Sequence, residues 1–356
     1  MNINGVIACC GCMSCVSVCP KKCISLVTDI LGFIYPQVDE DVCVNCSACT
    51  KVCPEIVKQP LEMPKQTFAG WCKDEKIRKN CTSGGLATAL SRFFVEQGGV
   101  VYGSAFMPPF DFKHIRCVNI EDLVMLRGSK YVQSAMSEVY EQMTKDLCNG
   151  LNVMFIGTPC QVAGIKAHFS KYVEQLYLID ILCHGTPSVK LLKDSLQVDD
   201  LISIKFRDNN CYQISYWADG MQIIRPQYKD LYLKGFLKGV ILRESCYSCR
   251  YTQKCRVGDL SLGDFWGYKN ENKGISLCLT NTIKGKMLFT SCRSIEYNEE
   301  NIDMAYTHNQ PLRDHIAYSW RTCLFRKCYS FIGFKWASIL AMPDIWIKSL
   351  FIRMNK

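Results

Sequence analysis

Three features of the sequence predict its fold class: a doubled cysteine run before residue 58, an alternation of apolar strands with amphipathic helices after residue 68, and a basic, aromatic C-terminal stretch. They indicate an α+β module of the ferredoxin type, then an α/β domain, then a helical tail. The chain has 356 residues, which leaves room for one large domain or two beyond the module. We therefore expect the module at 1–58, a linker at 59–67, the α/β domain at 68–317 and the tail at 318–356.

The module holds the spacing C-x2-C-x2-C-x3-C-P twice. This run is typical of bacterial ferredoxins, in which three thiolates hold one 4Fe-4S cluster and the fourth reaches across to the other cluster. Two zinc knuckles or a disulfide framework are the alternatives. Four ligands within eleven residues, with Cys-Pro closing each run, favour the ferredoxin interpretation. Crossed ligation then predicts two ligand sets, which we call the first and second cluster sites: Cys9, Cys12, Cys15 and Cys53, and Cys43, Cys46, Cys49 and Cys19.

Cysteine usage and charge bear on compartment and partners. The chain has 24 cysteines, and residues 1–5 lead directly into the first run without a signal peptide. We therefore expect a cytoplasmic, reducing environment in which cysteines serve as thiolate ligands rather than in disulfides. The formal charge of +9 falls to about +3 if three clusters each contribute about −2. We expect no nucleic-acid partner.

The α/β domain is predicted from its alternating pattern. The sequence indicates strands at 99–106, 151–156 and 176–182 and helices at 136–147 and 229–242. Ligands of open α/β sheets bind at the carboxyl ends of strands. The loops after the second and third of these strands are therefore the expected ligand sites.

Two segments have residues suited to phosphate. Thr82-Ser83-Gly84-Gly85 precedes a helical run at 86–94 and could present amides and hydroxyls to a phosphate, with a plain helix N-cap as the alternative. Arg127-Gly128-Ser129-Lys130-Tyr131 suits a diphosphate, but also an ordinary solvated loop. The chain has no G-x-G-x-x-G, G-x4-G-K-S/T or C-x3-C-x2-C motif, so any flavin or nucleotide binds another way.

A third cysteine group lies further along the chain. Cys246, Cys249 and Cys255 need a fourth ligand, and the sequence does not choose between the strand-end cysteines Cys160 and Cys183. Buried free cysteines or a zinc site are the alternatives. The other cysteines have no ligand spacing and are expected to act as small apolar residues: Cys10, Cys23, Cys72, Cys81, Cys117, Cys148, Cys211, Cys278, Cys292, Cys323 and Cys328.

His184 directly follows Cys183 in the loop after a predicted strand. A histidine there could supply a proton to a reduced substrate, because its pKa lies near neutrality. A structural hydrogen-bonding role is the alternative.

The tail is basic and aromatic. Residues 318–356 hold seven Lys or Arg against the single acid Asp344. Such a tail could lie on an anionic membrane surface or dock on a partner, or it could be a helix pair that covers the core. A transmembrane span is not expected, because Lys335, Pro343-Asp344 and Lys348 interrupt every apolar stretch well short of about twenty residues. The interleaved aromatic residues are Trp320, Phe325, Phe331, Phe334, Trp336, Trp346 and Phe351.

Taken in order, the motifs resemble a known family. They are Ser83-Gly84-Gly85, the run from Arg127 to Ser134, Gly157-Thr158-Pro159-Cys160-Gln161, Cys183-His184-Gly185, Cys246-x2-Cys249 and Gly263-Asp264-Phe265-Trp266-Gly267. From about residue 68 to at least 300 the chain is similar to the beta subunit family of coenzyme F-420 hydrogenase and dehydrogenase. The resemblance implies a third 4Fe-4S cluster on Cys246, Cys249, Cys255 and one strand-end cysteine. It also implies an FAD lined by Ser83, Gly84, Gly85, Ser129, Lys130, Tyr131 and Ser134.

The expected function is therefore that of an iron-sulfur flavoprotein oxidoreductase. Single electrons would pass through the clusters to or from FAD, which exchanges a hydride with an organic substrate or a deazaflavin-type coenzyme. We expect the second cluster site to face the third, and a redox partner such as ferredoxin, a deazaflavin coenzyme or NAD(P)H. The alternative is an electron-transfer adaptor that docks on a separate catalytic subunit and has no substrate of its own.

Overall fold

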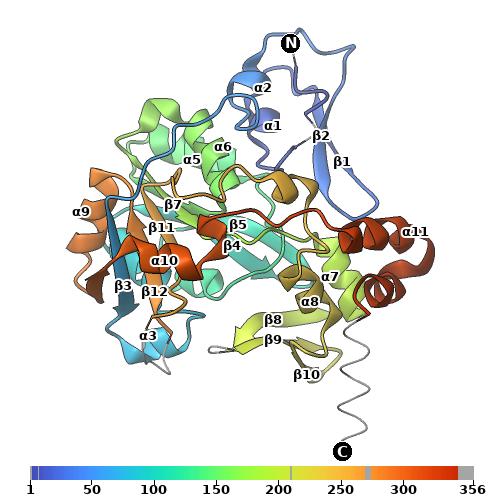
Figure 1. The fold of residues 1–356 in the computed structure, drawn as a ribbon. Coiled ribbons are helices and arrows are strands. Elements are labelled where there is room, and N and C mark those ends of the chain that lie inside the picture. The colour runs from blue at the N-terminus through green and yellow to red at the C-terminus, as the bar shows by residue number, and fades with distance from the viewer. Residues whose placement is uncertain (1, 7, 209–210, 269–273, 344–356) are drawn as a thin grey trace, which may run out of the picture.

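A computed structural model describes residues 2–6, 8–208, 211–268 and 274–343. The fold is a mixed α/β fold built around a large sheet (Figure 1). Trp346, Lys348 and Phe351 of the predicted tail lie outside the described residues. No helix within the described ranges is long and apolar enough to cross a membrane.

Eight strands form the central sheet. Four of them, β4, β6, β7 and β11, run parallel in the middle, and the flanking strands pair antiparallel. The order across the sheet is β13 (Ile295–Glu300), β3 (Gln66–Cys72), β12 (Ser276–Thr280), β11 (Leu260–Asp264), β7 (Leu176–Ile181), β6 (Val153–Gly157), β4 (Val100–Met107) and β5 (Asp111–Cys117).

Helices cover both faces of this sheet. The helices α4 (Leu86–Glu96) and α9 (Ile283–Ser291) pack on one face, and α5 (Val139–Cys148) and α6 (Pro159–His168) pack on the other. The side chains of β4 alternate accordingly, with Val101 in the core under α4 and Tyr102 in the core under α5. The predicted strands at 99–106, 151–156 and 176–182 and the helix at 136–147 are confirmed, with ends shifted by a few residues.

A second core joins a smaller antiparallel sheet to three helices. The strands are β8 (Leu201–Asp208), β9 (Cys211–Ala218) and β10 (Met221–Pro226), and the helices are α7 (Val189–Leu196), α8 (Leu231–Leu237) and α11 (Trp320–Ala341). The helix predicted at 229–242 is shorter than expected, because Gly239 takes a left-handed conformation with φ of +67° and ends it. The short elements that remain are α3 (Glu75–Lys79), α10 (Ile302–His308), and the 3-10 helices η1 (Asp122–Leu126), η2 (Ser170–Tyr172), η3 (Glu244–Ser248) and η4 (Gln310–Leu312).

The N-terminal module contains α1 (Ser14–Val18), the hairpin β1 (Ile24–Thr28) and β2 (Ile34–Val38), and α2 (Ala48–Lys51). Its doubled sequence produces the same local backbone twice: α1 begins after Met13 with φ of 64°, and α2 begins after Ser47 with φ of 62°. The module lies against α5 and α6 (Figure 1). The side chain of Tyr140 donates a hydrogen bond to the carbonyl of Cys12 at 2.7 Å.

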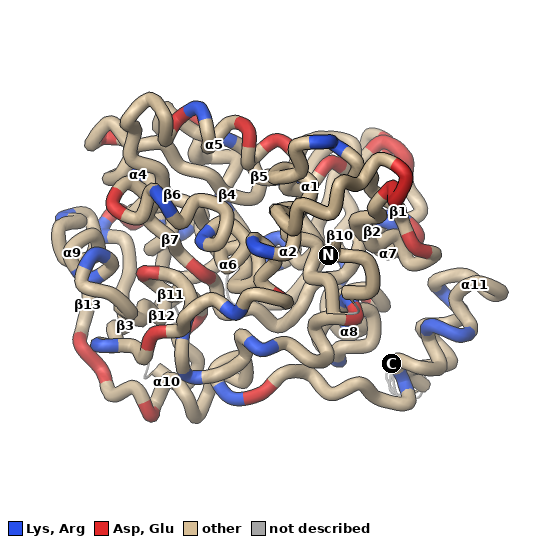
Figure 2. Tube along the Cα trace, turned by 90° about the horizontal axis from the view of Figure 1, so that it is seen from above, with Lys and Arg blue, Asp and Glu red and all other residues tan. Residues whose placement is uncertain are grey.

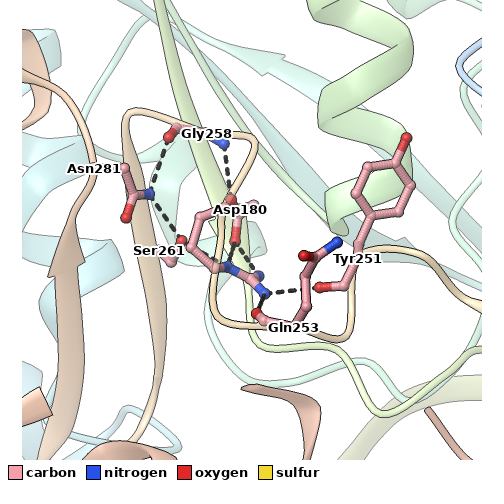
Figure 3. A network of polar contacts seen from close by, with 7 residues as sticks. Asp180, Tyr251, Gln253, Gly258, Ser261 and Asn281 are labelled. Atoms are coloured by element: carbon pink, nitrogen blue, oxygen red, sulfur yellow. Dashed lines mark hydrogen bonds and ion pairs between the residues drawn. The ribbon is translucent and has the colours of Figure 1, made fainter. Parts of the chain in front are cut away.

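A buried ion pair fixes the segment that follows the third cysteine group (Figure 3). Arg256, 1% exposed, pairs with Asp180 of β7, which is fully buried. The guanidinium also donates to the carbonyl of Tyr251 at 2.9 Å, and the Gly258 amide donates to Asp180 Oδ2 at 2.9 Å. Asn281 completes the network by donating to the carbonyl of Gly258 at 2.9 Å. Residues 251–258 are therefore tied to the sheet.

Removal of the Asp180 charge tests this network. Asp180→Asn leaves the Arg256 guanidinium buried without an anion, and breaking a buried pair in this way costs about 3–5 kcal/mol of unfolding free energy. We expect a large fall in the urea midpoint measured by tryptophan fluorescence. The control is Glu141→Gln, since Glu141 and its partner Lys145 are both exposed, and it should leave the midpoint unchanged. Equal midpoints for the two variants would contradict a stabilising role for the network.

Candidate functional site

The second cluster site lies on the outer side of the module. A small cavity there is lined by all four cysteines predicted by crossed ligation, Cys19, Cys43, Cys46 and Cys49. Cys46 is exposed. Cys23, expected to be a small apolar residue, also lines this cavity, and its Sγ lies 3.4 Å from that of Cys19.

The first cluster site lies between α1 and the segment after α2. Burial, and then the neighbouring thiols of Cys9 and Cys53, raise the pKa of Cys15 to about 12. Cys12 lies close to α6, because a side chain at Gly164 would approach its Sγ to 2.9 Å. The fold thus brings Cys9, Cys15 and Cys53 of the first set near one another and all four cysteines of the second set to one cavity, and their role as cluster ligands remains a prediction.

The third cysteine group differs from the expectation. Burial and the charges of Cys246, Cys160 and Cys249 raise the pKa of Cys183 well above its usual value. Burial and Cys160 also raise the pKa of Cys246 to about 11 and that of Cys249 to about 12. Cys160, Cys183, Cys246 and Cys249 therefore gather, so both strand-end cysteines belong to the group.

Cys255 lies near Tyr306 of α10, whose pKa is raised by burial and then by the charge of Cys255. The physical reason is the turn between Cys249 and Cys255, which Arg256 ties to Asp180 of β7. The backbone of its neighbour Arg256 also forms an isolated antiparallel β-bridge with the backbone of Glu62. We use the name third cluster site for the four cysteines that gather, Cys160, Cys183, Cys246 and Cys249, and their role as cluster ligands stays a prediction.

The first cluster site, rather than the second, faces the third. Cys10, expected to be a small apolar residue, supplies the contact: its thiol interacts with that of Cys12, which raises its pKa, and with that of Cys160. The cause is the docking of α1 on α6, because Cys160 lies in the first turn of α6.

No three His, Cys, Asp or Glu side chains among the described residues are arranged to hold a single metal ion. A 4Fe-4S cluster makes a different demand, because each of its four thiolates binds a different iron. Four half-buried thiols that lie close together at the wall of an apolar space fit such a cluster, since thiolates there need cations to compensate them.

Arg243 joins the module to the α/β domain. Its guanidinium is 1% exposed and donates to the carbonyls of Cys9 at 2.7 Å and Ile34 at 2.8 Å. It also donates to Oε1 of Gln133 at 2.9 Å, and it lies over the ring of Tyr35 at 4.3 Å. One buried cation therefore connects the first cluster site to the segment that contains Ser134.

A cavity of about 540 Å³ lies at the carboxyl ends of β6, β7 and β11. It is lined by Cys10, Cys160, Cys183 and His184, and by six of the seven residues expected to contact FAD: Ser83, Gly85, Ser129, Lys130, Tyr131 and Ser134. Gly84 is the exception. It packs against backbone, and a Cβ there would lie 2.4 Å from the carbonyl oxygen of Gly70. We call this space the cofactor cavity.

One end of the cofactor cavity suits phosphate. Gly85, with φ of +84°, begins α4, so the hydroxyls of Thr82 and Ser83 do not cap that helix. Thr82 instead accepts a hydrogen bond from the Ser129 amide at 2.9 Å, which joins the two predicted phosphate segments. The segment therefore supplies the N-cap of α4 through Gly85, as the plain N-cap alternative expected, but no side-chain cap occupies the first amides of the helix, which can face an anion.

Lys130 has a structural role in this geometry. Its ammonium donates to the carbonyls of Met125, Leu126 and Arg127 at 3.2, 2.9 and 3.0 Å, and so caps η1. Burial lowers its pKa to about 7. The three carbonyls favour the charged form, because only an ammonium has three N–H donors.

Two histidines in the cavity wall are neutral. Burial lowers the pKa of His114 to about 4, and its ring bonds to Ser134 Oγ at 2.9 Å and the Ile156 carbonyl at 3.1 Å. Burial also lowers the pKa of His184. Its Nε2 lies 3.2 Å from the carbonyl of Phe236, so that nitrogen carries the proton and Nδ1 does not.

An aromatic and charged group at the cavity was not predicted from the sequence. Arg207 pairs with Asp264 at 2.6 Å and lies over the rings of Tyr212 at 4.9 Å and Trp266 at 5.6 Å. Asp264 and Trp266 belong to a recognised motif, but Arg207 and Tyr212 come from the small sheet. A hydrophobic alternation in residues 211–218 was the available signal for that sheet.

Comparison with known proteins gives three family matches. The "Coenzyme F420 hydrogenase/dehydrogenase, beta subunit" models match residues 67–141 (N-term) and 150–303 (C terminus), and the "4Fe-4S dicluster domain" model matches residues 8–57. Among solved structures, a chain of the F420-reducing NiFe hydrogenase complex from Methanosarcina barkeri is similar at 20% identity. The similarity covers 68% of this chain and 84% of that chain, with a TM-score of 0.49. No curated protein matches the sequence.

Replacement of Arg243 tests the docking of the module. Arg243→Gln removes charge-assisted hydrogen bonds to both Cys9 and Ile34, each worth about 1.5–3 kcal/mol, so the module should undock at least about tenfold more often. Tryptic cleavage after the exposed Lys58 should accelerate by a similar factor. Arg92→Gln, which breaks only the exposed pair with Glu96, should leave the cleavage rate unchanged. A rate for Arg243→Gln equal to that of this control would refute the docking role.

The neutral state of His114 predicts a pH dependence. Its pKa is about 4 in the folded protein against 6.5 ordinarily, so unfolding takes up a proton between those values. The stability contributed by neutral His114 is fully present above about pH 6.5 and is lost as the pH falls toward 4. Urea midpoints across this window should fall less steeply for His114→Gln than for the wild type. Identical slopes would mean that His114 does not titrate in this way.

Proposed function

This chain belongs to the coenzyme F420 hydrogenase/dehydrogenase beta subunit family, and from that membership we propose that it is an FAD-dependent iron-sulfur oxidoreductase. FAD, when bound, exchanges single electrons with a cluster and a hydride with an organic substrate or deazaflavin-type coenzyme. The cofactor cavity is the observation that carries the proposal. Cys160 and Cys183 of the third cluster site and the predicted FAD residues line the same space.

The arrangement of the cysteine sites supports an order of electron transfer. The second cluster site lies outermost, with Cys46 exposed, and would meet a redox partner such as ferredoxin, a deazaflavin coenzyme or NAD(P)H. The first site lies between it and the α/β domain. Cys10 bridges the first site to Cys160 at the wall of the cofactor cavity.

The chain's own residues fit FAD at two ends of the cavity. The amides at the start of α4, with Thr82 and Ser83, would hold the diphosphate. Tyr131, whose ring stacks on Phe236 at 4.6 Å, offers an aromatic wall for the flat ring system. The Arg207, Tyr212 and Trp266 group would receive a planar substrate.

His184 would exchange the proton that accompanies hydride transfer. Its Nε2–H donates a hydrogen bond to the Phe236 carbonyl, which leaves Nδ1 as the proton acceptor. Nδ1 would accept a proton when substrate is oxidised and return it in the reverse reaction. Its lowered pKa keeps Nδ1 free of a proton at neutral pH.

A second candidate function is an electron-transfer adaptor bound to a separate catalytic subunit. The exposed second cluster site favours it, because such a site can serve a partner subunit as well as a small protein. Flavin reduction in the isolated protein by NAD(P)H or a reduced deazaflavin supports the self-contained enzyme. Reduction that requires a second subunit supports the adaptor.

Iron and flavin analysis after anaerobic reconstitution tests the proposal. We expect about twelve irons and one FAD in the wild type. Cys160→Ser, Cys183→Ser, Cys246→Ser and Cys249→Ser should each lose about four irons, because each removes a ligand of the third cluster. Cys255→Ser should keep them all.

Cys211→Ser is the matched control, since Cys211 is exposed on β9, away from all three sites. Zinc in the module without flavin would refute the proposal. Loss of iron from Cys255→Ser, with full iron in Cys183→Ser, would refute the ligand set.

A further inference from the structure

Helix α11 has two apolar faces, of which the protein covers one. Gly333, with φ of 71°, divides the helix into two halves. The inner face buries Phe325, Tyr329 and Phe334 in the core shared with α7 and α8. The covering-helix interpretation of the tail therefore explains this face only.

The outer face exposes large apolar side chains. Phe331, at the bend, is 87% exposed, and Trp320 and Trp336 are 60% and 58% exposed. In the second half, Trp336 and Leu340 lie four residues apart on one side of the helix, and Ile332 is exposed beside the bend. A cluster of exposed aromatic and aliphatic residues of this kind indicates an interaction surface.

The charges of α11 have a single sign. Residues 320–341 contain Arg321, Arg326, Lys327 and Lys335 and no acid. Along α11, Figure 2 accordingly shows blue, basic segments and no red, acidic ones. Glu244 neutralises Arg326 at 2.7 Å. Two of the other three cations accompany the exposed aromatics: Arg321 lies over Trp320 at 4.9 Å, and Lys335 over Trp336 at 5.7 Å.

The bend brings the two ends of α11 together. Arg321 donates a hydrogen bond to the carbonyl of Ala341 at 3.1 Å, so Trp320 lies near the last turn of the helix. The two halves thus form a compact platform. The sequence that follows continues the positive charge, with Lys348, Arg353 and Lys356 against Asp344.

We propose that α11 binds the surface of an anionic lipid bilayer. Trp320, Phe331 and Trp336 enter the headgroup region, while Lys327 and Lys335 contact lipid phosphates. Charge complementarity selects this occupant, because tryptophan paired with cations on an acid-free helix is the pattern of an interfacial helix. The binding is peripheral, and it would hold the reductase at a membrane independently of its flavin chemistry.

Vesicle co-sedimentation of the reconstituted full-length protein tests this proposal. We expect binding to vesicles that contain phosphatidylglycerol, little binding to pure phosphatidylcholine, and a strong reduction in high salt. The double variant Phe331→Ser, Trp336→Ser should bind at least about tenfold more weakly. Both side chains are largely exposed, so iron and FAD content should match the wild type.

The matched control is Ile283→Ser, Met287→Ser on α9, where two side chains are 66% and 64% exposed beside Lys284 and Lys286. This control should bind anionic vesicles as the wild type does. Absence of binding by the wild type, or equal loss in both variants, would overturn the proposal. A dimer in solution that the α11 variant alone abolishes, without vesicle binding, would assign the surface to a second copy instead.

Discussion

The burial of cysteine sulfur is the constraint on which the rest of the structure depends. Cys160, Cys183 and Cys246 gather from a helix start, a strand end and a 3-10 helix, in a space where burial disfavours the thiolate. Only a bound cation makes such a group of thiolates favourable. The parallel strands, the Arg256–Asp180 pair and the docked module all serve to hold these sulfurs in place.

Docking of the module sets the direction of the proposed electron path. Arg243, Tyr140 and the absence of a side chain at Gly164 press the first cysteine run against α6. The first run therefore lies inward and the second outward. The cofactor cavity begins where this path ends, because Cys160 and Cys183 lie at the carboxyl ends of two parallel strands.

Local spacing allowed the sequence to predict much of this arrangement. The doubled run predicted two ligand sets for the module, and the strand pattern placed Cys160 and Cys183 at strand ends. The spacing of Cys249 and Cys255 could not predict where Cys255 lies, because it carries no information on the turn that Arg256 imposes. The roles of Cys10, Arg243 and Arg207 depend on contacts between distant segments. The Arg127 to Tyr131 segment was recognised, but only the structure shows that Lys130 caps η1.

The most direct test is an iron anomalous-difference map from crystals of the anaerobically reconstituted protein. We expect three cluster peaks in a row. The second site lies outermost, the first lies beside Cys10, and the third lies among Cys160, Cys183, Cys246 and Cys249 at the wall of the cofactor cavity. A third peak bound by Cys255, or a second site that adjoins the third, would contradict this arrangement.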